Sequence, residues 1–396
     1  MHFDWRARAA LERRMARPAF RALSRALGRA VLHATIAPVA TALAESRATE
    51  DDLLFAVRCQ GVAGHLQPLL GQATGVWTAA TLDALELEAT RIAQRSTRLR
   101  SDLGAIAHAA AAEDLSWSPL KGTWLRLAAD AHPERRPSAD IDLLVDPDDA
   151  ARWDALLRSL GYACIDVDRH AMYMPAGAGP ADAAGDHPDH PRPVEVHTRI
   201  SEVVFGVARD VTTAYRQGLQ PSRVDGLSLR APSAGALALH LVLHGAAAMV
   251  SRGLRVSQLL DLRHLGADDS TRASLRAHLP VEAWAVATLA ERDVPGLVSP
   301  SLLVALADVA PPARLQRAIR SRPGVMEGDA LRWRTAVGEW RLAGTRHVVR
   351  RLREAVAGRV ALGSGAEATA VGAVGTHVRS ALDRLTGPRP PAASGE

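Results

Sequence analysis

Two aspartates that stand two residues apart begin an apolar run in residues 138–145, which read SADIDLLV. Side chains two apart on a strand project from the same face, so Asp140 and Asp142 would project together. Ile141 and Leu143 would then face the opposite layer. Two neighbouring carboxylates repel each other unless a cation neutralises them, and Mg²⁺ takes oxygen ligands that it shares with phosphates. The spacing therefore predicts a metal and phosphate site, with solvated acids at a strand edge as the alternative.

A third carboxylate follows in residues 194–197, which read VEVH. Alternation along a strand places Glu195 and His197 on one face. Three acids from two neighbouring strands could hold two metal ions, one activating an attacking hydroxyl and the other binding a triphosphate and its leaving group. The alternative for Glu195 is an exposed acid on an edge strand.

The pair Lys121-Gly122 is expected at a strand-to-helix turn upstream of the aspartates. Lys121 is the only lysine among 48 Lys and Arg residues, in a chain whose arginine bias fits a GC-rich coding sequence. Glycine lets a backbone approach a phosphate closely, and a helix N-terminus offers free N–H groups to an anion. Lys121 would add a compact positive charge, and Arg136 could reach the same anion. The turn therefore predicts a triphosphate site, although chance placement of the single lysine is the simpler alternative.

Other histidines are weaker candidates. His240 and His244 stand four apart, as paired metal ligands do on a helix, but no glutamate lies between them in a zinc-protease pattern. We interpret both as packing residues; one of them, or Asp261, could instead line a nucleotide cleft. Three histidines of a polar loop are predicted to be solvated, namely His170, His187 and His190.

The elements that must position these residues change character along the chain. Thr49 and the acids after it predict a capped helix start, and apolar spacing predicts a helix over 79–112. Strands are expected over 115–120, 141–145, 162–167 and 194–200, with helices over 123–131 and 146–161 and a loop over 175–193. Helices over 232–250 and 254–265 follow, and the C-terminal third is expected to be helical with breaks at prolines.

This pattern divides the chain into a small α/β core between helical regions, which is an α+β organisation. The expected parts are an amphipathic helical lead-in over 1–45, a helical region over 46–114, the core over 115–200, a helical region over 201–386 and a disordered tail over 387–396.

Composition excludes several classes of protein. The chain has 396 residues, of which 47% are apolar, enough for a large core. Two distant cysteines, Cys59 and Cys164, indicate neither a disulfide framework nor a zinc ribbon, which fits a reducing cytoplasm. Residues 1–5 do not begin a secretory signal, and the apolar run 234–250 is expected to be a buried helix rather than a membrane span. The net charge of +5 is spread along the chain, so we do not expect nucleic acid as a partner.

The combination of LKG at 120–122, RPSADIDLLV at 136–145, LGY at 160–162 and VEVH at 194–197 resembles the uncharacterised nucleotidyltransferase family, within the polymerase-β-type nucleotidyltransferase superfamily. The resemblance covers about residues 50–270. It implies a small mixed-sheet nucleotidyltransferase core, with Asp140, Asp142 and Glu195 as the catalytic metal carboxylates for Mg²⁺ or Mn²⁺. We expect the nucleotide to contact Lys121, Gly122, Thr123, Arg136, Ser138 and His197.

The resemblance implies transfer of a nucleoside monophosphate from an NTP, with ATP the expected donor, to a peptide, a small molecule or another acceptor. One departure supports a second reading. Lys121-Gly122 stands where the superfamily usually has Gly-Ser, so the hydroxyl expected to touch phosphate is absent unless Thr123 supplies it. The alternatives are a catalytically inactive nucleotide-binding or regulatory module on the same fold and, third, a glycosyltransferase that uses the two aspartates.

Overall fold

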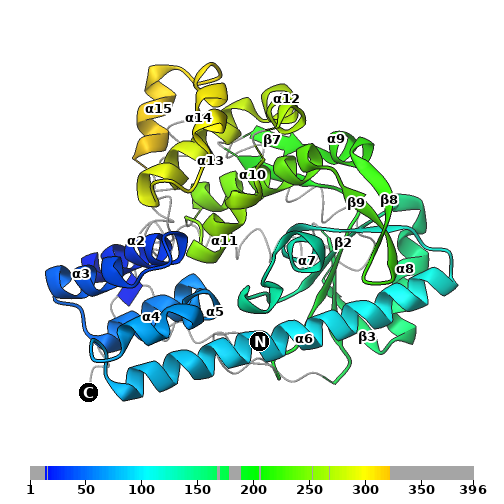
Figure 1. Cartoon of the computed structure of the whole chain (residues 1–396). Coiled ribbons are helices and arrows are strands. Elements are labelled where there is room, and N and C mark those ends of the chain that lie inside the picture. The colour runs from blue at the N-terminus through cyan, green and yellow to red at the C-terminus, as the bar shows by residue number, and fades with distance from the viewer. Residues whose placement is uncertain are drawn as a thin grey trace, which may run out of the picture. The chain divides into compact units, whose positions relative to one another are not determined.

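The aspartate pair lies at the start of β2 (Ile141–Val145), an inner strand of a five-stranded sheet (Figure 1). The computed structural model describes residues 14–321, apart from 16, 167–169, 178–188, 205–206, 252 and 267. The strand order is β1-β2-β5-β4-β3. Only the β2–β5 pair is parallel; the other neighbours are antiparallel. The remaining strands of this sheet are β1 (Trp117–Pro119), β3 (Tyr162–Asp166), β4 (Ala171–Pro175) and β5 (Val194–His197).

One face of the sheet packs on α6 (Ala79–Ala112) and α8 (Ala150–Ser159). Alternate residues of the strands face this layer because side chains alternate along a strand. A hydrophobic core cluster lies between the sheet and these two helices, and it includes the fully buried Trp153 of α8. The residues of β2 and β5 within it are Ile141, Leu143, Val145, Val194 and Val196. As the alternation predicts, the acids between them project from the opposite face.

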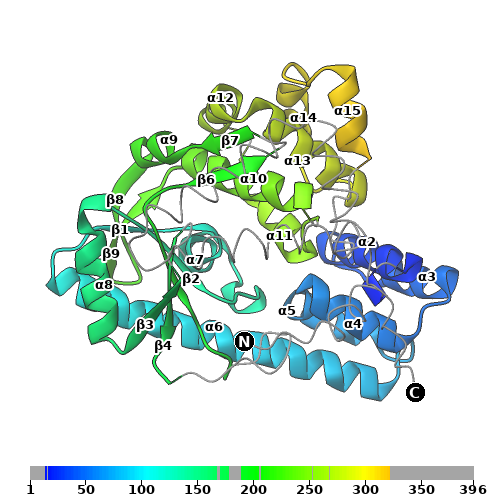
Figure 2. The ribbon, with the colours of Figure 1, turned by 180° about the vertical axis from the view of Figure 1, so that it is seen from behind.

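The helices before the sheet begin with α2 (Pro18–Leu32) and α3 (Ala37–Ser46), followed by α4 (Glu50–Gln60) and the short α5 (Ala63–Leu66). The predicted cap of α4 is confirmed: Thr49 Oγ1 accepts from Asp52 N at 3.2 Å, and Asp52 Oδ2 accepts from Thr49 N at 3.2 Å. Figures 1 and 2 show α6 running from these helices to the sheet, which it contacts at its C-terminal half.

The segment after β1 differs from expectation. The strand is shorter than 115–120, and the following helix starts at Lys121 rather than Thr123. It consists of α7 (Lys121–Trp124) and a π-helical turn over Leu125–Ala129. β4 was not predicted, because its mixed residues lack a clear alternation. A short 3₁₀ turn (Pro147–Asp149) precedes α8, so the predicted helix over 146–161 begins later.

Residues 201–232 correct the prediction that helices resume directly after the core. They form β6 (Ser201–Val204), β7 (Val207–Asp210), α9 (Thr212–Gln217) and a hairpin of β8 (Leu219–Val224) and β9 (Leu227–Pro232). The hairpin turn is Asp225-Gly226, with φ of 50° and 80°. Asp-Gly is a strong signal for this left-handed two-residue turn, because glycine adopts positive φ without steric cost.

The remaining described chain is helical. The helices are α10 (Ala234–Ser251), α11 (Val256–Asp261), α12 (Asp269–His278), α13 (Pro280–Asp293), α14 (Pro300–Ala307) and α15 (Ala313–Arg320). Within the described ranges, no helix has the length and apolarity needed to span a membrane. The predicted helical stretch beyond residue 321 and the predicted tail at 387–396 lie outside the described residues. The observed small mixed sheet with flanking helices confirms the predicted α+β fold class.

Candidate active site

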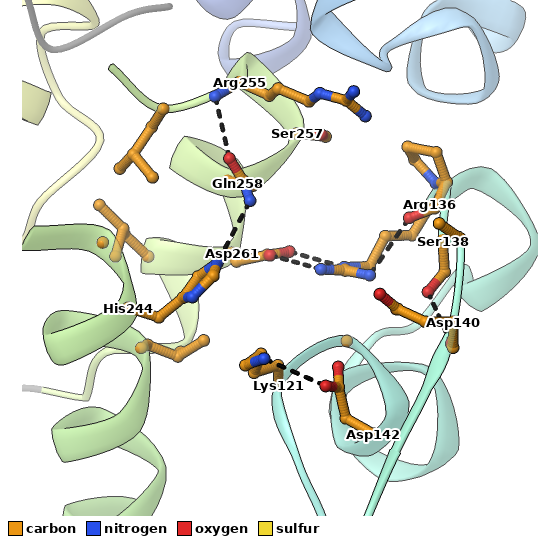
Figure 3. Close-up of a pocket in the computed structure, with 17 residues that line it drawn as sticks. Lys121, Arg136, Ser138, Asp140, Asp142, His244, Arg255, Ser257, Gln258 and Asp261 are labelled. Carbon is orange, nitrogen blue, oxygen red and sulfur yellow. Dashed lines mark hydrogen bonds and ion pairs between the residues drawn. The ribbon is translucent and has the colours of Figure 1, made fainter. Parts of the chain in front are cut away.

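A cavity of about 290 Å³ separates the start of β2 from helices α10 and α11 (Figure 3). Asp140, Asp142 and Lys121 reach it from the core side, while Gln258 and His244 approach from the helices opposite. Its lining residues are Lys121, Gly122, Arg136, Pro137, Ser138, Ala139, Asp140, Asp142, Leu241, His244, Gly245, Leu254, Arg255, Ser257, Gln258, Asp261 and Leu262. The cavity is within the size range of small-ligand pockets at its lower end.

The parallel pairing of β2 and β5 places Asp142 directly beside Glu195. The sequence segments are more than fifty residues apart, and only this register brings them together. His197 Nε2 lies 3.1 Å from Asp142 Oδ1 and 3.5 Å from Glu195 Oε2. The predicted acidic residues of two neighbouring strands therefore share one face, with an imidazole between them.

Lys121 Nζ donates to Asp142 Oδ1 at 3.0 Å. Burial alone would lower the pKa of Lys121, but the charges of Asp142, Asp140 and Glu195 raise it above its usual range. Burial would raise the pKa of Asp142, yet Lys121 and His197 hold it well below its usual range. Lys121 itself has φ of 41°, a left-handed conformation that costs energy in a residue with a Cβ. The only lysine of the chain thus points at the predicted acidic centre.

Asp140 is the least compensated of the three acids. Its carboxylate points into the cavity (Figure 3), and in the part of the chain that the structure describes no side chain donates a hydrogen bond to it. Burial, reinforced by the charges of Asp142 and Glu195, raises its pKa to about 6. Carboxylate oxygens with surplus negative charge are the donor set that Mg²⁺ or Mn²⁺ prefers, so these residues fit such an ion.

The raised pKa of Asp140 predicts a pH-dependent cost. Native Asp140 holds its proton more tightly than the unfolded chain, so its contribution to stability declines as pH rises from about 4 to about 6 and is constant above. In metal-free buffer, Asp140→Asn should therefore be more stable than wild type above pH 6, by on the order of 2 kcal/mol. Denaturant unfolding of both proteins across this range measures the difference. If the difference in free energy of unfolding between the two proteins did not grow between pH 4 and 6, the raised pKa of Asp140 would be contradicted.

Glu195 faces two histidines. His170 Nε2 lies 3.2 Å from Glu195 Oε2, and the His170 ring stacks on His197 with centroids 4.5 Å apart. Burial would raise the pKa of Glu195, but hydrogen bonds from both imidazoles lower it to about 2. Burial would lower the pKa of His197, and its contacts with Asp142 and Glu195 raise it instead. The prediction that His170 is a solvated loop residue is wrong, because the β4–β5 pairing returns it to the acids.

Two residues predicted at the phosphate have other contacts. Thr123 is buried, and its Oγ1 accepts from the backbone N–H of Asp142 at 2.9 Å, so its hydroxyl anchors β2 instead of facing the cavity. Gly122 lines the cavity, but a Cβ there would collide with the guanidinium of Arg136. Packing against Arg136 thus favours glycine at this position, in addition to the predicted approach of a phosphate.

Arg136 forms a paired ion bridge instead of a free anion contact. Its Nε and Nη2 donate to Asp261 Oδ1 and Oδ2 at 2.8 and 2.6 Å, and both side chains are nearly buried. Burial would lower the pKa of Arg136, while Asp261 raises it. The pair crosses the cavity between the core and α11 (Figure 3). Ser138 lines the cavity as predicted, with Oγ donating to the Asp140 carbonyl at 3.2 Å.

Arg95 of α6, which the sequence did not single out, holds both acid-bearing segments. Its guanidinium donates to the carbonyls of Ser138 and Ala139 at 2.9 and 2.7 Å, just before β2. It also donates to the carbonyls of His190 and Pro191 at 2.9 and 3.0 Å, before β5. The sequence offers no signal for this contact, since Arg95 is one arginine among many on a long helix. Its fixed fork of donors suits several carbonyls at once.

Arg95→Met should lower the free energy of unfolding by about 2–3 kcal/mol, because it removes the side-chain donor from four part-buried carbonyls. Arg98→Met is the matched control on the same helix, because Arg98 pairs with the exposed Asp189. Equal melting temperatures for the two variants would show that the contacts of Arg95 with these carbonyls do not stabilise the fold.

The wall facing the acids was only partly foreseen. His244 and Asp261 line it, as the sequence allowed. His240 is instead buried, with its ring edge-on to Tyr215 at 5.7 Å. Arg255 and Gln258 were missed; the backbone N–H of Arg255 donates to Gln258 Oε1 at 3.1 Å, and Gln258 Nε2 lies 3.4 Å from His244 Nε2. Only the helical spacing of 254–265 hinted at this surface.

A small mixed sheet that carries acids on two neighbouring parallel strands, beside a cavity walled by helices, is the arrangement expected of a nucleotidyltransferase. Residues 46–276 match the family described as "Uncharacterised nucleotidyltransferase", and the chain belongs to this family. The family and fold support a role in nucleotidyl transfer.

The solved structure of the antibiotic-resistance factor ANT(2'')-Ia is similar at 16% sequence identity, over 46% of this chain and 91% of that chain, with a TM-score of 0.32. A likeness at that TM-score carries no information about substrate. No curated protein matches the sequence.

Proposed function

We propose that the chain is a metal-dependent nucleotidyltransferase that moves a nucleoside monophosphate from an NTP, with ATP the expected donor, to a peptide or small-molecule acceptor. The observation that carries the proposal is the β2–β5 register, which sets Asp142 beside Glu195 while Asp140 points into the adjoining cavity. Neighbouring acids beside a cavity repel each other and lower stability. A reaction on a metal-bound triphosphate would explain their presence, because the metal ion neutralises their charge.

In this proposal Asp140, Asp142 and Glu195 would hold Mg²⁺ or Mn²⁺, which supplies charge neutralisation on the phosphates when bound. Lys121 already lies against Asp142 and is charged, so it can turn to a phosphate oxygen at the same position. Thr123 and Arg95 fix the backbone that carries the acids. The role of these residues is mainly to position the reactants and to balance charge.

The wall formed by His244, Arg255 and Gln258 gives the nucleotide or the acceptor its polar partners. The Arg255 side chain extends along the cavity beyond Ser257 (Figure 3), and it is exposed. It is therefore available to an anionic group, whereas Arg136 is occupied by Asp261. We assign Arg255, rather than Arg136, as the arginine that contacts substrate.

The test combines the protein with Mg²⁺ and NTPs labelled on the α-phosphate, with and without an extract of the source cells. Asp140→Ala/Asp142→Ala serves as the blank. We expect that only the wild type transfers label to an acceptor, or releases pyrophosphate when water is the acceptor. UDP-sugar turnover with no use of NTP would instead identify a glycosyltransferase and overturn the proposal.

A second candidate is a nucleotide-binding module without transfer. The observation that favours it is the Lys121–Asp142 contact, in which a protein cation already neutralises one of the acids. The same assay separates the two: this candidate predicts nucleotide binding by wild type with neither pyrophosphate release nor label transfer in the extract.

A further inference from the structure

A cluster of two histidines and a glutamate lies against Asp142, and its members are not among the residues that line the cavity. Its members are His170, just before β4, and Glu195 and His197 of β5. The Nε2 atoms of both histidines face the same oxygen, Glu195 Oε2, at 3.2 and 3.5 Å. One ligand atom from each residue lies within 4.8 Å of the other two. Among the described residues, these are the side chains whose nitrogen and oxygen atoms converge in this way.

Strand pairing and ring stacking hold the three side chains together. Strand pairing sets Met172 beside Glu195 and Ala171 beside Val196, which brings His170 next to the end of β5. The His170 and His197 rings stack with an angle of 28° between their planes, and both Nε2 atoms lie near Glu195 Oε2. The side chains of His170 and Glu195 are 26% and 14% exposed, which shelters the cluster while leaving a path for an ion.

We propose that His170, Glu195 and His197 bind a transition-metal dication of the Zn²⁺ class. Two imidazoles and one carboxylate suit such ions, whereas Mg²⁺ takes oxygen ligands. Asp142 Oδ1, at 3.1 Å from His197 Nε2, offers a fourth ligand from the neighbouring strand. The ion would replace the histidine–carboxylate contacts that now neutralise Glu195.

This site goes beyond the proposed transfer reaction, although it shares Glu195 with it. An ion held at Glu195 would fix the third carboxylate beside the aspartates, and it would need no nucleotide to bind. The acidic centre would then combine an oxygen-ligated position at Asp140 and Asp142 with a nitrogen-ligated position at the two histidines.

The experiment titrates Co²⁺ into metal-free full-length protein with excess Mg²⁺ and no nucleotide. Mg²⁺ occupies all-oxygen positions. Co²⁺ held in the four-coordinate geometry of a Zn²⁺-type site absorbs strongly in the visible, whereas six-coordinate, oxygen-ligated Co²⁺ absorbs weakly. We expect stoichiometric binding, displacement by Zn²⁺, and an affinity at least about 10-fold lower in His170→Ala.

His132→Ala is the matched control, because His132 Nδ1 lies 3.4 Å from Glu134 in an exposed pair. Circular dichroism and thermal unfolding verify that both variants fold. Absence of the absorption in wild type, or equal Co²⁺ affinity in wild type and His170→Ala, would overturn the site. Neither result bears on nucleotide transfer, which the NTP assay decides separately.

Discussion

Asp142→Asn is expected to lower the rate of nucleotidyl transfer by about 10³-fold or more, which corresponds to about 4 kcal/mol of transition-state stabilisation. Asp142 is the acid on which the other groups converge, since Lys121 Nζ and His197 Nε2 both contact its Oδ1. Its pKa lies well below the usual range, so it is ionised at any assay pH near neutrality. Asparagine keeps the shape but removes both the charge and an anionic metal ligand.

Single-turnover transfer with saturating NTP and Mg²⁺ measures this effect, and thermal unfolding checks that the variant folds. Asp148→Asn is a matched control, because Asp148 follows the same strand but is exposed beyond its far end. Its rate should stay within about 2-fold of wild type, as for other exposed substitutions. If Asp142→Asn transferred at the wild-type rate, the metal-ligand role of Asp142 would be refuted.

Asp261→Ala is expected to lower the free energy of unfolding by about 3–5 kcal/mol. Asp261 accepts two hydrogen bonds from the Arg136 guanidinium, and only about a tenth of either side chain is exposed. Removing the carboxylate leaves a buried guanidinium without its counter-charge. Gly122 holds the backbone close to that guanidinium, so Arg136 cannot swing toward α7 to relieve the loss.

Denaturant unfolding measures the change. Asp269→Ala on α12 is the control: Asp269 pairs with Arg272, but its side chain is 96% exposed, so its loss should cost less than about 1 kcal/mol. The double variant Arg136→Met/Asp261→Leu should recover most of the lost stability, because it removes both buried charges together. Equal costs for Asp261→Ala and Asp269→Ala would show that the bridge does not join the core to α11.

The charged residues around the cavity have two different functions. Asp142 and Lys121 form an ion pair that can be rearranged when a ligand arrives, because a single ammonium contact imposes little direction and can turn to another anion. Arg136 and Asp261 form a bidentate bridge that fixes the cavity walls. The distinction follows from geometry, since a planar guanidinium on a carboxylate is a directional clamp while an ammonium is a point charge.

The local elements that carry the acids could be predicted from the sequence. Alternation around Asp140 and Asp142 predicted a strand with one apolar face, and the same reasoning placed Glu195 and His197 together. Thr49 and its acids predicted a capped helix that the structure confirms. Such features depend on neighbours within a few residues, and local periodicity and capping chemistry therefore reveal them.

Which distant groups meet depends on how the separate segments of the chain pack together. The contacts of Arg95 with two loops, of Arg136 with Asp261, and of His170 with Glu195 join residues far apart in the chain. No local sequence pattern distinguishes these side chains from the other arginines and histidines of the chain. Their partners are set by strand register and helix packing, because each contact requires two separately folded segments to end at the same place.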